Sequence, residues 1–392
     1  MSDAVLFLSA RRTPIGAFQG ALATLSAPLL GSAAMRAAIS SAGIAAADLD
    51  EVLMGCVLPA GLGQAPARQA ALGAGVPAEV PATTVNKMCG SAMKAIMLGA
   101  DQLAAGRAEL VLAGGLESMS NAPYLLPKAR TGYRMGHGEI LDHMFYDGLQ
   151  SAWDGKLMGC FADATAQKYG FTRKEQDAFA AESVRRAMRA LQAGEFDAEV
   201  APVEITSRKG VSTLTRDETP FKCDLAKIAT LKPAFGPGGT VTAASSSSIS
   251  DGAAAAVLTC ESVARQRKLA PIARLAAWAS SAMAPEWFTI APVTAIGKVL
   301  KSAGWKASDV DLYEVNEAFA VVAMAAMREL KLDHERLNVN GGACALGHPI
   351  GATGARIITT LIHALQKRGG RRGVAALCIG GGEATAVAIE LV

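Results

Sequence analysis

The chain repeats part of its own sequence, and this repeat limits the folds open to it more than any other feature. Ser-Ala-Gly at 41–43, followed after four residues by Asp-Leu-Asp at 48–50, recurs as Ser-Ala-Gly at 302–304 and Asp-Val-Asp at 309–311. Both pieces are displaced by the same 261 positions. Chance recurrence of common tripeptides is the alternative. Self-similarity on this scale is typical of a fold built from two similar halves.

A second pair of segments supports the duplication. Leu110–Ser118 resembles Ala376–Ala384, since each is an apolar run with glycines and a glutamate. In both halves we expect a helix, an Asp-flanked turn, a short strand, a longer segment, a strand, a helix and a strand that ends in glycines. This alternation predicts an α/β protein with a mostly parallel sheet covered on both faces. Two stacked copies predict a five-layer α/β/α/β/α arrangement.

The middle of the chain differs from the flanking halves, because it holds charged helical segments such as 173–192 and glycine-rich turns. We predict an N-terminal core half, an inserted loop (lid) domain and a C-terminal core half, with the bounds 1–119 plus 250–268, 120–249 and 269–392. Where the insert ends, Ile249–Gly252 leads into an alanine-rich stretch. We predict a helix there, with Ser250 or Asp251 near its N-cap.

Composition excludes several classes of protein. The 392 residues are 51% hydrophobic and 19% charged, so the chain can bury a large core and is not disordered. The 40 glycines show no period, which excludes a collagen. No apolar run reaches the roughly 18 residues of a membrane-spanning helix, and Met1–Arg12 lacks the order of a secretory signal. We therefore expect a cytoplasmic protein with no membrane partner.

Cysteine, histidine and net charge narrow the chemistry further. The seven cysteines form no C-x-x-C pair and the five histidines no H-E-x-x-H, so we expect neither a disulfide framework nor a metal site. The formal net charge of +3 is too small for a nucleic-acid partner. It suits an anionic small ligand.

Cys89 is the first candidate catalytic residue. It lies where a β-prone stretch, Thr83–Val85, gives way to a nearly apolar helical run that extends to Ala104. A sharp strand-to-helix turn presents a nucleophile, and the helix N-terminus with its free N–H groups favours a thiolate. The plain alternative is an inert buried thiol.

His348 is the second candidate, in a glycine-rich segment before a helix predicted to begin near Gly351. The 261-residue offset relates Cys89 to Ile350, so the duplication predicts both candidates at equivalent strand-to-helix turns. If the halves pack about a pseudo-twofold axis, the turns meet and form a Cys–His pair that activates the thiol. The rival is a dinucleotide-binding loop, but no G-x-G-x-x-G with an acidic residue about 20 positions later is present.

A third site follows an apolar strand that ends at Cys378. The backbone N–H groups of Gly380–Gly382 suit an oxyanion hole. A second thiol at this edge suits a reaction that needs a covalent carrier and a proton-transfer group; a redox disulfide between Cys89 and Cys378 is the alternative. Asn316 lies between two acids at another strand-to-helix boundary, where a plain helix N-cap is the simpler interpretation.

Four motifs together resemble the thiolase family, in the family's order and over essentially the full chain. They are NKMCGSAMKA at 86–95, NEAFA at 316–320, GGACALGHPIGATGAR at 341–356 and CIGGGEA at 378–384. The resemblance implies the thiolase fold, with two βαβαβαββ halves and a loop domain, assembled as a homotetramer built from dimers. It also implies an acyltransferase that acts on acyl-CoA, with coenzyme A as substrate or product and no other cofactor.

The roles of the site residues come from the same resemblance. It implies that Cys89 takes the acyl group as a thioester, that His348 activates Cys89, and that Cys378 moves the proton at the α-carbon of the second acyl-CoA. Asn316 would hold a water that, with His348, stabilises the enolate oxygen. The N–H groups of Cys89 and Gly380 would form the second oxyanion hole. The implied reaction is the reversible Claisen condensation of two acetyl-CoA to acetoacetyl-CoA.

The chain departs from the family pattern in its expected substrate pocket. Leu157 replaces the histidine of the His-Met-Gly loop of acetoacetyl-specific members, and a run of four serines, 245–248, replaces Asn-Ala-Ser-Gly. The resemblance places substrate contacts at Leu157, Met158, Ser247, Ala318 and Phe319. The basic residues Lys222 and Lys227 of the insert are candidates to contact the nucleotide phosphates of coenzyme A, and ordinary surface lysines that aid solubility are the alternative.

A more apolar pocket leaves a broader or degradative 3-ketoacyl-CoA thiolase as the first alternative. A ketoacyl synthase and a thiolase-like lipid-binding protein are the others. The second cysteine in CIGGG disfavours the synthase, and the presence of Cys89, His348 and Cys378 disfavours the binding protein.

Overall fold

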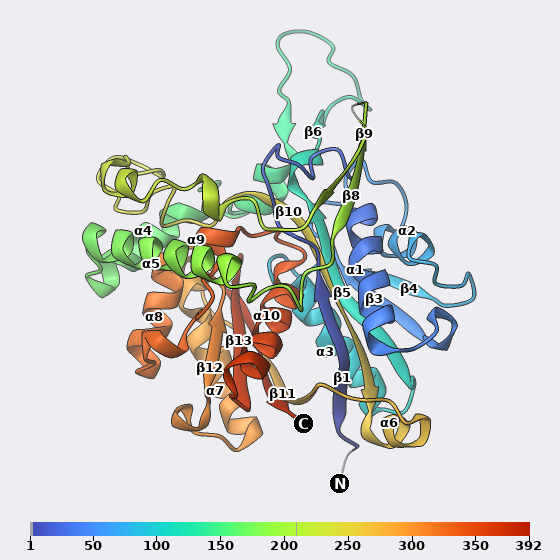
Figure 1. The fold of residues 1–392 in the computed structure, drawn as a ribbon. Coiled ribbons are helices and arrows are strands. Elements are labelled where there is room, and N and C mark those ends of the chain that lie inside the picture. Colours follow the sequence, from blue (N-terminus) through green and yellow to red (C-terminus); the bar gives the residue numbers. More distant parts are fainter. Residues whose placement is uncertain (1–2, 209) are drawn as a thin grey trace.

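A computed structural model describes residues 3–208 and 210–392. Met1 begins the segment compared above with a secretory signal and lies outside the described residues. The N-terminal half alternates strands and helices along the chain (Figure 1). Its elements are β1 (Val5–Arg12), β2 (Gly16–Ala17), α1 (Ala27–Ala42), β3 (Glu51–Gly55), α2 (Pro66–Gly73), β4 (Ala82–Val85), α3 (Ser91–Ala104), β5 (Leu110–Ser118), β10 (Ser250–Cys260) and α6 (Glu261–Arg267).

The C-terminal half repeats this order with one local difference. Its elements are β11 (Ala273–Ala282), α7 (Ala291–Ala303), β12 (Leu312–Val315), α8 (Ala320–Leu330), α9 (Ala343–Leu346), α10 (Thr353–Arg368), β13 (Arg372–Ile379) and β14 (Glu383–Leu391). Where the first half has β4, the second has the short helix α9, preceded by an isolated parallel bridge between Tyr313 and Leu337. Left-handed backbone at Asn338 and Gly341 interrupts the extended conformation that a strand needs.

The strands of both halves form one mixed sheet in the order β12-β13-β14-β11-β1-β10-β5-β3-β4. Only β3 with β4, β3 with β5, and β12 with β13 are parallel within the described residues, so the prediction of a mostly parallel sheet is wrong. The last strand of each half returns antiparallel to the strand before it, β10 to β5 and β14 to β13. A short antiparallel pairing of Leu6 with Arg274 and Phe7 with Ala273 joins the two halves.

The five-layer arrangement is confirmed. Helices α3 and α10 pack against each other and against strands of both halves, which makes them the central layer. Helices α1 and α2 cover the outer face of the N-terminal strands, and α7 and α8 cover the outer face of the C-terminal ones (Figure 1). Three apolar clusters correspond to this layering, one around the central helices and one beneath each outer layer. Small residues of α3, among them Ala92, Ala95 and Gly99, permit the close approach of the layers.

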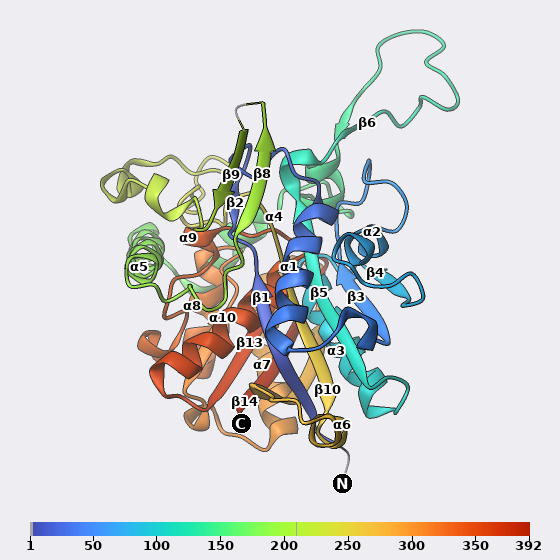
Figure 2. The ribbon, with the colours of Figure 1, turned by 45° about the vertical axis from the view of Figure 1, so that its right-hand side comes forward.

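Segment 120–249 adds no strand to the large sheet within the described residues. Its elements are β6 (Tyr124–Leu125), β7 (Leu141–Asp142), a π-helical turn (Met144–Leu149), α4 (Met158–Tyr169), α5 (Arg173–Gln192), β8 (Val203–Ser207) and β9 (Gly210–Leu214). The loop between β6 and β7 extends away from the rest of the molecule in both views (Figure 2). The division into three domains stays a prediction.

The alanine-rich stretch after Gly252 is a strand, β10, and not the helix predicted from composition. All of its residues are buried, and it pairs with β1 on one side and β5 on the other. Tertiary pairing overrides the helix propensity of alanine, because a central strand between two helix layers needs small side chains. Asp251 therefore caps no helix; its Oδ1 accepts the N–H of Ser120 at 2.9 Å.

Candidate active site

Cys89 lies in a tight turn between β4 and α3, as predicted. Met88 just before it adopts left-handed backbone, with φ of 49°, which costs energy for a residue with a side chain. Ser91 fixes the turn, because its Oγ accepts the N–H of Lys87 at 2.8 Å and donates to Met88 O at 2.6 Å. Lys87 Nζ lies 2.6 Å from Glu383 Oε2, which ties the turn to the start of β14 in the other half.

The environment of the Cys89 sulfur does not produce a resting thiolate. Burial raises the pKa of Cys89 to about 11, although the backbone N–H groups of Gly380 and Cys89 lower it. The expectation that the helix N-terminus favours a thiolate is therefore wrong in its net effect, since desolvation outweighs the N–H groups. Cys89 needs a base to become a nucleophile. The same two N–H groups point toward the sulfur. They therefore lie near the position where the carbonyl oxygen of a thioester formed at Cys89 would develop negative charge.

His348 is held as a neutral imidazole. Its Nδ1 lies 2.6 Å from Thr353 Oγ1, and that hydroxyl donates to Pro349 O at 2.9 Å. Since the hydroxyl proton is used, Thr353 must accept from Nδ1–H, which assigns the tautomer and leaves a lone pair on Nε2. Nε2 is buried and has no hydrogen-bond partner among the described residues. Burial, with a contribution from Arg356, lowers the pKa of His348 to about 3, so the ring is uncharged near neutral pH.

Cys378 and Asn316 are two further candidate residues with buried side chains. Cys378 is fully buried, and burial together with the charge of Cys89 raises its pKa well above the ordinary value, so the two thiols lie within electrostatic reach. Asn316 follows β12, and its backbone N–H donates to Ala376 O at 2.9 Å. Neither atom of its side-chain amide has a partner among the described residues, and Asn316 caps no helix, because α8 begins at Ala320. Buried unpaired amides are costly and usually have a functional reason.

The N-termini of α3 and α10 bring the two candidate turns together. A Cβ on Gly354 would lie only 2.4 Å from Met93 N, so the first turns of these helices are in direct contact. Cys89 packs on an apolar cluster that contains Ile350. The predicted meeting of the turns is therefore seen, but the element before His348 is the short helix α9 instead of a strand.

A cavity of about 170 Å³ opens beside His348 and is mostly apolar. It contains five of the substrate-binding residues expected from the sequence, namely Leu157, Met158, Ser247, Ala318 and Phe319. Met158 also lines a second cavity, of about 210 Å³, whose other walls include Met88 and Gly380. The two cavities thus share Met158; His348 lines the first and Gly380 lines the second.

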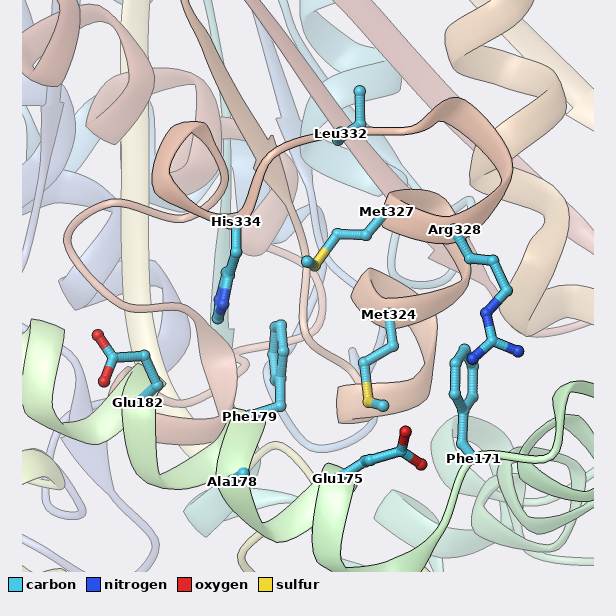
Figure 3. Close-up of a pocket in the computed structure, with 10 residues that line it drawn as sticks. All are labelled: Phe171, Glu175, Ala178, Phe179, Glu182, Met324, Met327, Arg328, Leu332 and His334. Carbon is cyan, nitrogen blue, oxygen red and sulfur yellow. The ribbon is translucent and has the colours of Figure 1, made fainter.

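Lys222 and Lys227 are exposed and do not line either cavity. Lys222 Nζ lies 3.2 Å from Glu218 Oε1, and Lys227 Nζ lies 3.2 Å from Asp224 Oδ2. A third hollow, of about 520 Å³, lies between α5 and α8 and contains none of the candidate catalytic residues. In Figure 3 the side chains of Met324 and Met327 face Phe179 across this groove.

Several residues of the site were not identified from the sequence. Phe235, Leu149 and Phe145 line the cavity beside His348, but they come from the insert and carry no recognisable local pattern. Thr353 orients His348 and follows it by five positions at the start of α10. The signal that was available for Thr353 is a hydroxyl in the first turn of a helix directly after a histidine.

Neither a metal-binding cluster nor a membrane-spanning helix is found among the described residues. No group of three or more His, Cys, Asp or Glu side chains is arranged to hold a metal ion in the part of the chain described here. Within the same residues, no helix combines the length and apolar character that crossing a membrane requires.

Nearly the whole chain matches the models of one protein family. Residues 5–262 match the model of the thiolase N-terminal domain, and residues 269–391 match that of the thiolase C-terminal domain. The chain belongs to the thiolase family. It is 48% identical to an acetyl-CoA acetyltransferase of Pseudomonas aeruginosa over 99% of both chains, and 48% identical to that of Escherichia coli over 98% of both.

Solved structures give the same result. The acetyl-CoA acetyltransferase of Bacillus anthracis superposes with a TM-score of 0.97 at 40% identity, covering 100% of this chain and 99% of the other. A thiolase from Ascaris suum, solved in complex with coenzyme A, superposes with a TM-score of 0.94 at 42% identity, covering 99% and 100%. The resemblance seen in the four sequence motifs and the thiolase fold are both confirmed.

Proposed function

We propose that this chain is an acetyl-CoA acetyltransferase, which condenses two acetyl-CoA to acetoacetyl-CoA and coenzyme A and runs the reverse thiolysis. The observations that carry the proposal are a protonated, half-buried Cys89 thiol and a neutral His348 whose Nε2 has no partner among the described residues, on turns that meet where α3 contacts α10. Relatives of almost equal length with this activity support the substrate. The bound coenzyme A of the Ascaris suum relative supports it further.

The first half-reaction transfers the acetyl group to the enzyme. His348 Nε2 takes the proton of Cys89 as the sulfur attacks the thioester carbonyl. The N–H groups of Cys89 and Gly380 stabilise the tetrahedral oxyanion. The bond to the coenzyme A sulfur then breaks, and Cys378 gives its proton to the departing thiolate. Acetyl-Cys89, an imidazolium at His348 and a thiolate at Cys378 remain.

The second half-reaction forms the carbon–carbon bond. The Cys378 thiolate takes a proton from the α-carbon of a second acetyl-CoA. A water on the unpaired amide of Asn316 and the Nε2–H of His348 stabilise the enolate oxygen. The carbanion attacks acetyl-Cys89, the bond to the sulfur breaks, and His348 returns its proton to Cys89. Both cysteines and the histidine regain their starting states, so atoms and protons balance.

Leu157 supports a second candidate, a thiolase of broader chain length. Its side chain lines the cavity beside His348 together with Leu149, Phe145 and Ile350, and a wall of this kind favours apolar acyl chains over acetyl alone. Parallel assays of thiolysis with acetoacetyl-CoA and a six-carbon 3-ketoacyl-CoA separate the two candidates. A dominant four-carbon rate supports the acetyl-specific enzyme.

The proposal extends to partners and location. We infer acyl-CoA as the small-molecule partner, a homotetramer built from dimers, and a cytoplasmic location. The phosphate contacts of Lys222 and Lys227 are part of the same proposal, and coenzyme A binding would release them from Glu218 and Asp224. The proposed domain division remains the one set out from the sequence.

Mass spectrometry after incubation with acetyl-CoA tests the mechanism. We expect an acetyl adduct on Cys89 that is absent in Cys89→Ser. Cys160→Ser is the matched control, because Cys160 is a partly exposed thiol outside both cavities that line the site. Cys378→Gly should still form the adduct, more slowly because the departing thiolate then takes its proton from water, and should lose condensation. An adduct exclusively on another residue would contradict the proposal, as would condensation by Cys378→Gly at the wild-type rate.

A further inference from the structure

Glu117 is a fully buried carboxyl group for which the proposed mechanism has no use, at the end of β5. We propose that Glu117 is a positioning residue for His348, which holds the turn from His348 to Gly351 of one half against the loop after β3 of the other. The inference rests on the proposed function, since it assigns Glu117 a task in that same reaction.

Both carboxyl oxygens of Glu117 are used to capacity. Oε2 accepts the N–H of Gly351 at 2.8 Å and the N–H of Val57 at 3.0 Å. Oε1 accepts the N–H of Leu58 at 3.2 Å, with the Cys56 thiol at 3.7 Å. A side chain that accepts hydrogen bonds at both of these positions has to end in a carboxyl group. A glutamine amide would place its NH2 donors against two of the donors that Glu117 now binds.

The turn at Gly351 is packed directly against the carboxyl group of Glu117. A Cβ on Gly351 would lie 2.5 Å from Glu117 Oε2, so only glycine permits this approach. His348 precedes Gly351 by three residues, and the Nδ1 contact with Thr353 ties the ring to the same stretch of chain. A shift of the turn therefore moves the imidazole. Small misplacements of catalytic groups cost about 100-fold in rate.

The duplication relates Glu117 to Cys378, the candidate thiol in the other half. The 261-residue offset that relates the halves relates Glu117 to Cys378, and both are the second-last residues of equivalent strands, β5 and β13. Each reaches across to the other half: Cys378 lies within electrostatic reach of Cys89, and Glu117 binds Gly351 next to α10. One copy of the position supplies a reacting thiol, and the other supplies the anchor of the base.

Glu117 also acts on Cys89 through its charge. Burial raises the pKa of Glu117 to about 7, although the three backbone N–H groups lower it. The charge of Glu117 contributes to the raised pKa of Cys89. The groups whose charge is coupled to that of Cys89 include Glu117 and Cys378. The pKa of Cys89 therefore reports on the charge of Glu117, and a purely structural role of Glu117 would leave that pKa unchanged.

The test compares Glu117→Gln, Glu117→Asp and the control Cys56→Ala in acetoacetyl-CoA thiolysis. The glutamine variant loses acceptors, and the aspartate variant keeps the charge but loses reach. We expect kcat to fall about 10- to 100-fold in both, with KM within about twofold of wild type. Cys56→Ala removes a thiol that contacts the same carboxyl group but leaves the three N–H groups that Glu117 binds in place, and should keep the wild-type kcat.

A second measurement follows alkylation of Cys89 by iodoacetamide against pH. The inflection should move to lower pH in Glu117→Gln, where the like charge is gone, and stay in place in Glu117→Asp. If the glutamine variant does not fold, the aspartate variant still tests the positioning. The inference is overturned if kcat of the folded Glu117 variants lies within twofold of wild type, or if Cys56→Ala loses as much. An inactive wild-type enzyme would instead refute the proposed function.

Discussion

Replacement of Thr353 by valine tests how His348 is held as a base. Thr353 Oγ1 accepts Nδ1–H at 2.6 Å and donates to Pro349 O at 2.9 Å. Valine keeps the shape but removes the acceptor, so a buried N–H loses its partner at a cost of about 1–3 kcal/mol. The imidazole escapes this cost by moving the proton to Nε2 or by turning, and either change removes the lone pair that takes the Cys89 proton. The competent fraction then falls about 5- to 150-fold.

The assay is the rate of acetyl-Cys89 formation after rapid mixing with acetyl-CoA, followed by mass spectrometry. Thr353→Ser keeps the hydroxyl and should acetylate at close to the wild-type rate. Thr359→Val is the matched control, because Thr359 is a buried threonine of the same helix whose hydroxyl donates only to Ala355 O, at 2.9 Å. Acetylation of Thr353→Val at the wild-type rate would refute the tautomer assignment.

Three further changes give separate tests. Leu157→His should lower the rate on a six-carbon 3-ketoacyl-CoA relative to acetoacetyl-CoA, and an unchanged ratio in steady-state assays would remove Leu157 from the specificity argument. Burial raises the pKa of Glu314 to about 8. Between about pH 4.5 and 8 the folded state therefore holds a proton that the unfolded state releases, so the free energy of unfolding falls as pH rises through that window. Urea unfolding at pH 5 and pH 9 should show a smaller loss in Glu314→Gln than in wild type, and an equal loss would contradict the assignment. Arg12 lies buried between Glu199 and Asp217, so Arg12→Met should lower the free energy of unfolding by about 3–5 kcal/mol, and an unchanged urea midpoint would show that these charges are not stabilised by Arg12.

Much of the site was predictable because its parts are local in sequence. The turn at Cys89, the glycines after Cys378 and the segment around His348 each follow from a strand or helix boundary that neighbouring residues define. The orienting contacts were not predictable in the same way. Glu117 and Gly351 are 234 positions apart, and no local pattern reports a hydrogen bond between them.

The net electrostatics also required the folded structure. From the sequence, a helix N-terminus favours a Cys89 thiolate, but burial by residues from both halves raises the pKa of Cys89 to about 11. The same burial keeps His348 neutral. The proposed mechanism therefore relies on activation of the Cys89 thiol by His348, as the sequence predicted, and not on a preformed thiolate.

The sequence by itself determined the duplication, the layered architecture and the family, and it identified Cys89, His348 and Cys378 as candidate reacting side chains, because repeats, apolar periodicity and motifs are written along the chain. Only the tertiary structure decided that the alanine-rich stretch is the strand β10, that α9 replaces a strand before His348, and which partners hold each reacting group. The physical reason is that sheet pairing, desolvation and hydrogen bonds depend on which residues meet in space.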